Sequence, residues 1–171
     1  MGGALFGHKS ESTVGLQIQR DAIRNGLLHT KARQEISETR RDRIKETSVG
    51  AYFENTTHWA DKFRTVVGLR EDYYNFNVKS SLDANSGKTH ASLFSPKLSL
   101  IFGPWAKTEF YLNAVTGFHR TDACGTLLAI DPTSGDPADR VAGLVRVQGG
   151  EAGLHPQISP RVQTRCSRLR L

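Results

Sequence analysis

Apolar and polar residues alternate most clearly over residues 92–118. In the first half of this stretch one parity is apolar, at Phe94, Leu98, Leu100 and Phe102, and in the second half apolar residues again recur at every other position. A period of two is the pattern of a β-strand with two different faces. Gly-Pro between the halves is turn chemistry that the interior of a strand does not tolerate. The stretch therefore predicts a β-hairpin, with Pro96 as the one irregular position in its first arm.

Each arm of this hairpin has about ten residues, which is the length that a tilted strand needs to cross a bilayer. Trp105 lies at the turn, where an aromatic residue of a membrane interface is expected. A soluble sandwich could contain the same hairpin. The choice between the two depends on whether the pattern repeats along the chain.

The alternation does repeat. Further strands are predicted from Ser12, at residues 49–55, at residues 62–76 and, more weakly, at about 143–154. The parity predicts one lipid-type face, made of Val14, Leu16, Ile18, Phe63, Val67, Leu69, Leu98, Leu100, Phe110 and Leu112. It predicts an opposite, polar face that carries Arg64, Arg70, Asp72, Glu109 and Asn113. The expected fold is all-β, an antiparallel meander of five or six strands.

The connections between these strands differ in length. Residues 25–46 are polar and of mixed charge, and they predict a long loop, with a short surface helix around 32–43 as the alternative. Residues 80–90 and 120–142 are rich in turn residues and predict further loops. The remaining links are short, and they hold the two tryptophans, Trp59 and Trp105. Transmembrane barrels place short turns at one rim and long loops at the other, so we expect both tryptophans at one membrane interface.

Composition limits the alternatives. The chain has 171 residues and 23 Lys and Arg against 17 Asp and Glu. It has no apolar run of the ~20 residues that a spanning helix requires, and its start does not fit a signal peptide. The basic residues cluster in the 31–45 connection and the tail without an aromatic stacking platform, so nucleic acid is not expected as a partner. Cys124 and Cys166 are expected to be free thiols.

Chemical motifs are weak. Ser86-Gly87-Lys88-Thr89 resembles the end of a phosphate-binding loop, but the motif needs Gly where the chain has Leu82. Three aspartates in the 131–139 region lack the spacing of a calcium loop. The six histidines share no ligand spacing, and no nucleophile and base stand in a recognisable arrangement. We therefore expect no enzyme activity, no metal site and no cofactor.

Several motifs in order resemble the barrel of TonB-dependent outer-membrane receptors. They are the run from Phe94 to Leu100 (FSPKLSL), then TEFYLNA and Gly117-Phe118-His119, together with VGLREDY from Val67 and GEAGL from Gly150. The similarity covers roughly residues 11–154. It implies an outer-membrane protein for uptake of scarce ligands such as siderophores, other metal chelates or oligosaccharides, energised through TonB. The polar-face residues would then line the barrel lumen, and the apolar face would meet outer-membrane lipid.

The resemblance lacks several parts of the family. The sequence shows no plug domain, no TonB box and no terminal strand with a final aromatic residue. We therefore expect an internal segment of a barrel, whose partners would be the missing plug and the remaining strands, and which does not transport alone. Residues 1–10 are expected to be an unstructured start, 11–155 the partial barrel, and 156–171 an irregular basic tail. The alternative is a small soluble all-β binding module with a basic surface.

Overall fold

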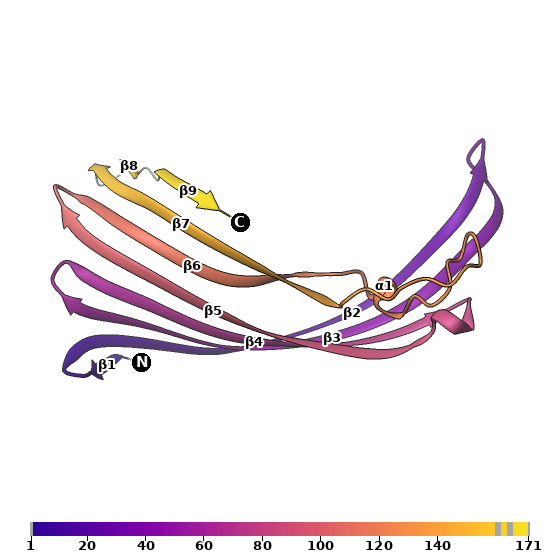
Figure 1. The fold of residues 1–171 in the computed structure, drawn as a ribbon, viewed down its shortest axis with the longest axis horizontal. Helices are drawn as coiled ribbons and strands as arrows, with labels where there is room; N and C mark the ends of the chain where they lie inside the picture. Colours follow the sequence, from indigo (N-terminus) through magenta and orange to yellow (C-terminus); the bar gives the residue numbers. More distant parts are fainter. Residues whose placement is uncertain (1, 160–161, 164–165, 171) are drawn as a thin grey trace.

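The fold is a single curved antiparallel sheet in a computed structural model that describes residues 2–159, 162–163 and 166–170. Consecutive strands pair in chain order from β1 to β8, and β9 pairs with β7. The long strands are β2 (His8–Lys31), β3 (Gln34–Ala60), β4 (Phe63–Ser80), β5 (Gly87–Trp105), β6 (Thr108–Arg120) and β7 (Leu144–Ser159); the short ones are β1 (Gly2–Leu5), β8 (Val162–Gln163) and β9 (Cys166–Arg170). Figure 1 shows these strands side by side as an open trough. The all-β class and the meander of six long strands are confirmed.

The expected long loop at residues 25–46 is wrong, and so is its helical alternative. β2 and β3 form one long hairpin that turns at Ala32 and Arg33, both with positive φ. The pairing runs from Ser10 opposite Thr57 to Lys31 opposite Gln34. Alternation is hidden here because both faces of the hairpin are polar, so a period-two hydrophobic signal is absent although the backbone ladder continues.

The two ends of the chain also differ from expectation. Residues 1–10 were expected to be unstructured, but they contain β1 and the start of β2, and Gly3 pairs with Ser10. The expected irregular tail at 156–171 continues β7 to Ser159, and β9 pairs with β7. Residues 1, 160–161, 164–165 and 171 lie outside the described part. An open strand edge offers unpaired N–H and C=O groups, and pairing satisfies them even where the side chains show no alternation.

A small core lies at the end of the sheet that carries the longer connections. There α1 (Ala123–Leu127) contacts β3, β4 and β5. Figure 1 shows α1 at that end of the sheet. The buried apolar side chains of this core are Ile44, Phe76, Val78, Ala123, Cys124 and Leu127. The short helix η1 (Asp83–Asn85) fastens the same region, because the Asn85 side chain bonds the backbone of Ala129 and Ile130 at 2.8–2.9 Å. The 121–143 connection is thus fixed on one face of the sheet.

The β5–β6 pairing covers only part of these strands. It ends at Lys97 opposite Val115, whereas β4 stays paired with β5 through Pro96 to Gly87. Proline has no N–H to donate to a ladder. Pro96 therefore stands where the loss of a donor matters least, at the point where β6 leaves β5. We call this point the β5–β6 seam.

Candidate functional site

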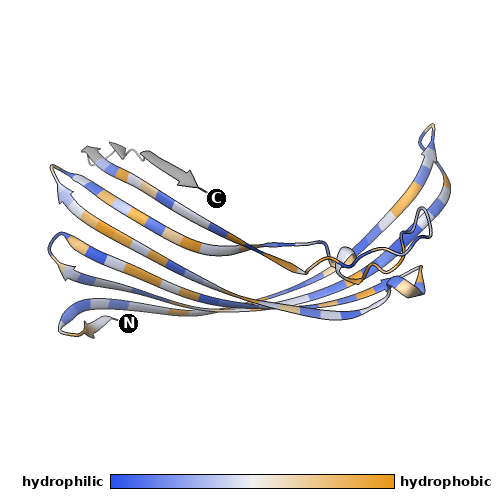
Figure 2. Ribbon diagram, viewed as in Figure 1, coloured by the Kyte–Doolittle hydropathy of each residue, from blue (hydrophilic) through white to orange (hydrophobic). Residues whose placement is uncertain are grey.

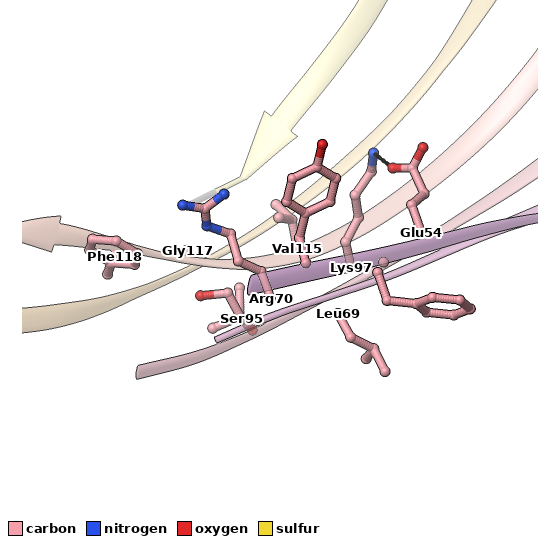
Figure 3. Close-up of a pocket in the computed structure, with 12 residues that line it drawn as sticks. Glu54, Leu69, Arg70, Ser95, Lys97, Val115, Gly117 and Phe118 are labelled. Atoms are coloured by element: carbon pink, nitrogen blue, oxygen red, sulfur yellow. Dashed lines mark hydrogen bonds and ion pairs between the residues drawn. The ribbon is translucent and has the colours of Figure 1, made fainter. Parts of the chain in front are cut away.

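The strand register divides the side chains between two faces of the sheet. Directly paired residues share a face, and Leu69 pairs with Phe53 and Pro96 while Arg70 pairs with Tyr52 and Ser95. Figure 3 shows Leu69 on the opposite side of the sheet from Arg70 and Lys97. The hydropathy colouring in Figure 2 alternates along the strands in the same way. The predicted parity of the two faces is confirmed.

One face carries the ten predicted apolar residues, and we call them the outer belt: Val14, Leu16, Ile18, Phe63, Val67, Leu69, Leu98, Leu100, Phe110 and Leu112. Their rows connect across the sheet, for example Val67 with Leu98 and Leu100 with Leu112. Most of them are exposed, and Leu16 and Leu112 expose 65% and 50% of their surface. A largely apolar exposed face of this kind marks contact with a membrane or a partner. One charged residue of these strands, the exposed Glu71 opposite Phe94, lies on the same face.

The opposite face carries all five predicted polar residues, and the structure gives each a partner. Arg64 binds Glu109 through two parallel bonds of 2.7 and 2.9 Å that reach from β4 to β6. Arg70 binds Asp72 on the same strand through two bonds of 2.7 Å. Asn113 donates to Glu151 on β7 at 3.1 Å. These five residues do not converge on one point, and they belong to an ion-pair network spread over the polar face.

Sequence reasoning missed the other members of this network. Lys97 pairs with Glu54 at 3.3 Å, and Tyr111 donates to Glu151 at 3.0 Å. Nearer the α1 end, Arg120 binds the buried Glu46 and lies 3.8 Å from Asp21. Each pair joins residues at least 38 positions apart, so only the strand register could have revealed them. Strand parity was a usable signal for Lys97, Glu54 and Tyr111, but not for Arg120, which has the same parity on β6 as Leu112 of the outer belt.

The two tryptophans lie at the same end of the sheet, near the short turns between β3 and β4 and between β5 and β6. Trp59 Nε1 donates to Thr65 Oγ1 at 2.8 Å, and its ring lies 5.3 Å from that of His8. Trp105 lies 6.1 Å from the ring of Phe110 and carries the Lys62 ammonium 5.9 Å over its own ring. Thr65 and Phe110 belong to the face of the outer belt, so both rings adjoin that face.

A second polar cluster lies beneath α1. Asp42 is almost fully buried, binds Arg40 and accepts from the Cys124 thiol at 3.2 Å. Burial, together with the hydrogen bond to the Asp42 carboxylate, raises the pKa of Cys124 to about 12. The thiol is therefore protonated at neutral pH and is a poor nucleophile or metal ligand. In the described ranges no group of three or more His, Cys, Asp or Glu side chains could hold a metal ion.

The β5–β6 seam opens a cavity of about 370 Å³. Its lining comes from β3, β4, β5 and β6 and includes side chains of both faces, such as Leu69 and Arg70. Figure 3 shows this lining, with the Lys97–Glu54 pair beside the cavity. No nucleophile with an adjacent base lies among the lining residues, so the cavity offers space and polarity without a catalytic arrangement.

Among residues 2–159, 162–163 and 166–170, no helix has the length and apolar character needed to span a bilayer.

Comparison with known proteins gives one family and several similar folds. The model of the family described as TonB dependent receptor-like, beta-barrel matches residues 2–155. No curated protein sequence matches the chain. Solved structures with a similar fold include the copper transporter OprC (TM-score 0.67, 14% identity, 95% of this chain and 28% of that one). The ferric yersiniabactin uptake receptor FyuA from Yersinia pestis is similar at TM-score 0.64 and 13% identity, over 95% of this chain and 26% of that one.

A third solved structure is the alcaligin outer membrane receptor FauA from Bordetella pertussis, with a TM-score of 0.58 and 12% identity. The match covers 95% of this chain and 30% of FauA. At these identities the likeness concerns the fold. The chain thus spans less than a third of the length of each of these three proteins.

Proposed function

Because the chain belongs to the β-barrel family of TonB-dependent receptors, we propose that its sheet is a segment of an outer-membrane barrel wall. The family is one of transport receptors rather than enzymes. In this proposal the outer belt faces lipid, and the polar face with Arg64, Arg70, Asp72, Glu109 and Asn113 faces the barrel lumen. Trp59 and Trp105 lie at one membrane interface.

The exposed outer belt is the observation that carries this proposal. Burying apolar surface is worth about 25 cal/mol per Å², so a face of exposed Val, Leu, Ile and Phe is stable only against lipid or another apolar surface. The opposite face fits an aqueous lumen, because its charges are paired, two of the pairs across strands and Arg70–Asp72 within β4. A charge on the lipid side would instead cost about 2–4 kcal/mol at the bilayer midplane.

The transported ligand in this proposal is a scarce metal complex, such as a siderophore, with an oligosaccharide as the alternative. Two of the similar structures are described as a copper transporter and a ferric yersiniabactin uptake receptor, which favours the metal class. Uptake would require TonB, a plug domain and the remaining barrel strands. The open edges of the described sheet support the further proposal that this chain alone neither closes a barrel nor transports a ligand.

Site-directed spin labels test the assignment of the faces. Single cysteines would be placed at Leu98 and Leu112 in the outer belt and at Lys97 and Asn113 on the polar face, after Cys124 and Cys166 are changed to Ser. In vesicles we expect labels at the first two positions to collide with lipid-soluble oxygen and labels at the other two with a water-soluble nickel chelate. Equal accessibility of the four labels, or a stable monomer in buffer with a cooperative thermal transition, would favour a soluble binding module instead.

A separate measurement tests whether the chain alone closes a barrel and transports a ligand. The purified chain in detergent is expected to run at the same position on a gel with and without heating, because an open sheet lacks the resistance of a closed barrel. It is expected not to support ligand uptake in cells that lack the intact receptor. Heat-modifiable barrels together with uptake by the chain alone would show that the segment is complete in itself.

A further inference from the structure

On the face of the outer belt, the side chains change from apolar to cationic toward the end of the sheet that carries α1. The row that contains Ile18, Val49 and Tyr73 is apolar or aromatic, and the rows beyond it, toward the end with α1, are cationic. Arg24, Arg43 and Lys79 are directly paired with one another across β2, β3 and β4. With the neighbouring outward residues of the same strands and of β5 they form what we call the basic rows: Arg20, Arg24, Arg43, Lys45, Lys79 and Lys88.

Charge on these strands is sorted by face. On β3 the exposed Arg43 and Lys45 alternate with the buried Asp42, Ile44 and Glu46. The carboxylates of Asp42 and Glu46 lie on the polar face, where Arg40 binds the first and Arg120 the second. All six members of the basic rows are exposed, and none forms a salt bridge within the part of the chain that the structure describes.

This arrangement is unfavourable by itself. Like charges directly opposite each other on neighbouring strands destabilise a sheet, and here three cations stand in one row. Arg43, Lys45, Asn77 and Lys79 surround a hollow of about 260 Å³ that is lined mainly by their carbon stems. The guanidinium and ammonium groups that these stems carry suit an anion with several oxygen acceptors. An anionic partner would remove the repulsion and satisfy these donors.

The position of the basic rows identifies that partner. They continue the outer belt without a gap, so whatever covers the belt also meets the cations. Lys45 precedes Trp59 by fourteen residues on β3, which at ~3.3 Å per residue and a tilt of about 45° is about 33 Å across the sheet. That height compares with the ~30 Å hydrocarbon core of a bilayer. With Trp59 at one interface, Lys45 reaches the headgroups of the other.

We propose that the basic rows bind the phosphate groups of anionic lipid headgroups at the rim that carries the longer connections. The inference rests on the proposed function, because it needs the outer belt in lipid. The occupant is a phosphorylated lipid in the bilayer, held by Arg and Lys donors around the hollow between β3 and β4. Each cation near an anionic surface contributes about fivefold to binding.

Vesicle binding of the full chain tests the proposal. Partition would be measured into vesicles of phosphatidylcholine alone and of phosphatidylcholine mixed with phosphatidylglycerol. The native chain is expected to prefer the anionic vesicles, and added salt is expected to weaken the preference. The variant R24Q/R43Q/K45Q/K79Q is expected to lose about a hundredfold or more of this preference.

A matched control removes the same charge elsewhere. Lys9, Lys31, Lys107 and Arg140 are exposed and lie outside the basic rows, so the variant K9Q/K31Q/K107Q/R140Q is expected to keep most of the preference. The variant R24K/R43K keeps the charge and is expected to behave as the native chain. Equal losses in the two quadruple variants, or an unchanged preference in the first, would overturn the proposal.

Further measurements distinguish a failure of the proposed function from a failure of the basic rows, and lipid from other anionic ligands. Failure of the native chain to enter neutral vesicles as a β-sheet would contradict the lipid-facing belt, and thus the proposed function. Entry into neutral vesicles without an anionic preference would contradict the basic rows alone. Displacement from the anionic vesicles by a single-stranded oligonucleotide, or by inorganic phosphate at equal phosphorus concentration, would overturn the lipid assignment in favour of those ligands.

Discussion

Arg64 and Glu109 form the best-defined contact on the polar face. The two side chains are 30% and 27% exposed, and two parallel bonds fix their geometry across the intervening β5. Bidentate Arg–carboxylate pairs are stronger than single contacts, although partial exposure screens them. The pair therefore holds β6 to β4 in addition to the backbone ladder.

A double-mutant cycle with R64M and E109Q is expected to give a coupling of about 1 kcal/mol in the free energy of unfolding, measured by urea in detergent micelles. The matched control is Lys97 with Glu54, whose side chains are 46% and 44% exposed and 3.3 Å apart. That pair is expected to couple by less than about 0.5 kcal/mol. Equal couplings would show that bidentate geometry contributes nothing here.

Cys124 is expected to resist thiol reagents. Its pKa of about 12 leaves almost no thiolate at pH 8. In a Cys166→Ser background, alkylation is expected to be slow until denaturant is added, and a fast reaction under native conditions would contradict the burial of this thiol.

From the raised pKa of the Cys124 thiol we also expect the free energy of unfolding to depend on pH. The folded pKa of Cys124 lies above the ordinary value of 9.0, so the folded state keeps the proton that the unfolded state loses. Its contribution is complete below pH ~9 and is lost as the pH rises toward about 12. Unfolding measured across this range should show a decline that Cys124→Ala lacks, and parallel curves for the two proteins would exclude the effect.

At the scale of elements, the β5–β6 hairpin depends on Gly103. Its φ is +116°, and a Cβ there would lie 2.8 Å from the Thr108 carbonyl oxygen. Gly103→Ala is expected to destabilise the sheet by more than about 1 kcal/mol. Gly117→Ala, where a Cβ meets nothing within 4 Å, is the control and should change stability by less than about 0.5 kcal/mol. Similar denaturation midpoints for the two variants would contradict this role of the turn.

The hairpin at 92–118 could be predicted because one face of each arm is apolar and the other is polar. The part of the β2–β3 hairpin at residues 25–46 could not, because Arg43 and Lys45 are exposed on one face there while Asp42 and Glu46 are buried on the other. Both faces there are polar, so the sequence lacks hydrophobic contrast although the strands continue. Long-range backbone pairing, which no local pattern encodes, decides the structure of such a segment.

The polar face was predictable to the same extent. Parity alone put Arg64, Glu109 and Asn113 on one side. Their partners depend on register, as when Asn113 meets Glu151 because β6 and β7 pair in one alignment. A shift of one residue would have moved each partner to the other face. The face on which a side chain lies is therefore set locally by strand parity, whereas the partner that it contacts is set by the register of the whole sheet.

At the scale of the molecule, the two faces should respond differently to the same charge. Leu112 in the outer belt and Val115 on the polar face are 50% and 45% exposed and lie three residues apart on β6. In vesicles, Leu112→Arg is expected to lower the free energy of unfolding by about 2–4 kcal/mol. Val115→Arg is expected to cost at most about 1 kcal/mol, mainly from repulsion by its neighbour Lys97.

The comparison has an internal check, because exposure and strand are matched and only the face differs. An equal cost for the two variants in vesicles would mean that lipid does not distinguish the faces.

The β5–β6 seam has a mechanical consequence for the whole sheet. Between Lys97 and the tryptophan end of the sheet, backbone hydrogen bonds join all six long strands. Beyond Lys97, toward α1, β6 and β7 remain paired with each other but make no ladder bonds to β5. A sheet resists bending through its cross-strand bonds, so stiffness drops along this line. Bending of the sheet is therefore easiest along this line, next to Pro96, and the separation of β6 from β5 there leaves the cavity beside Arg70.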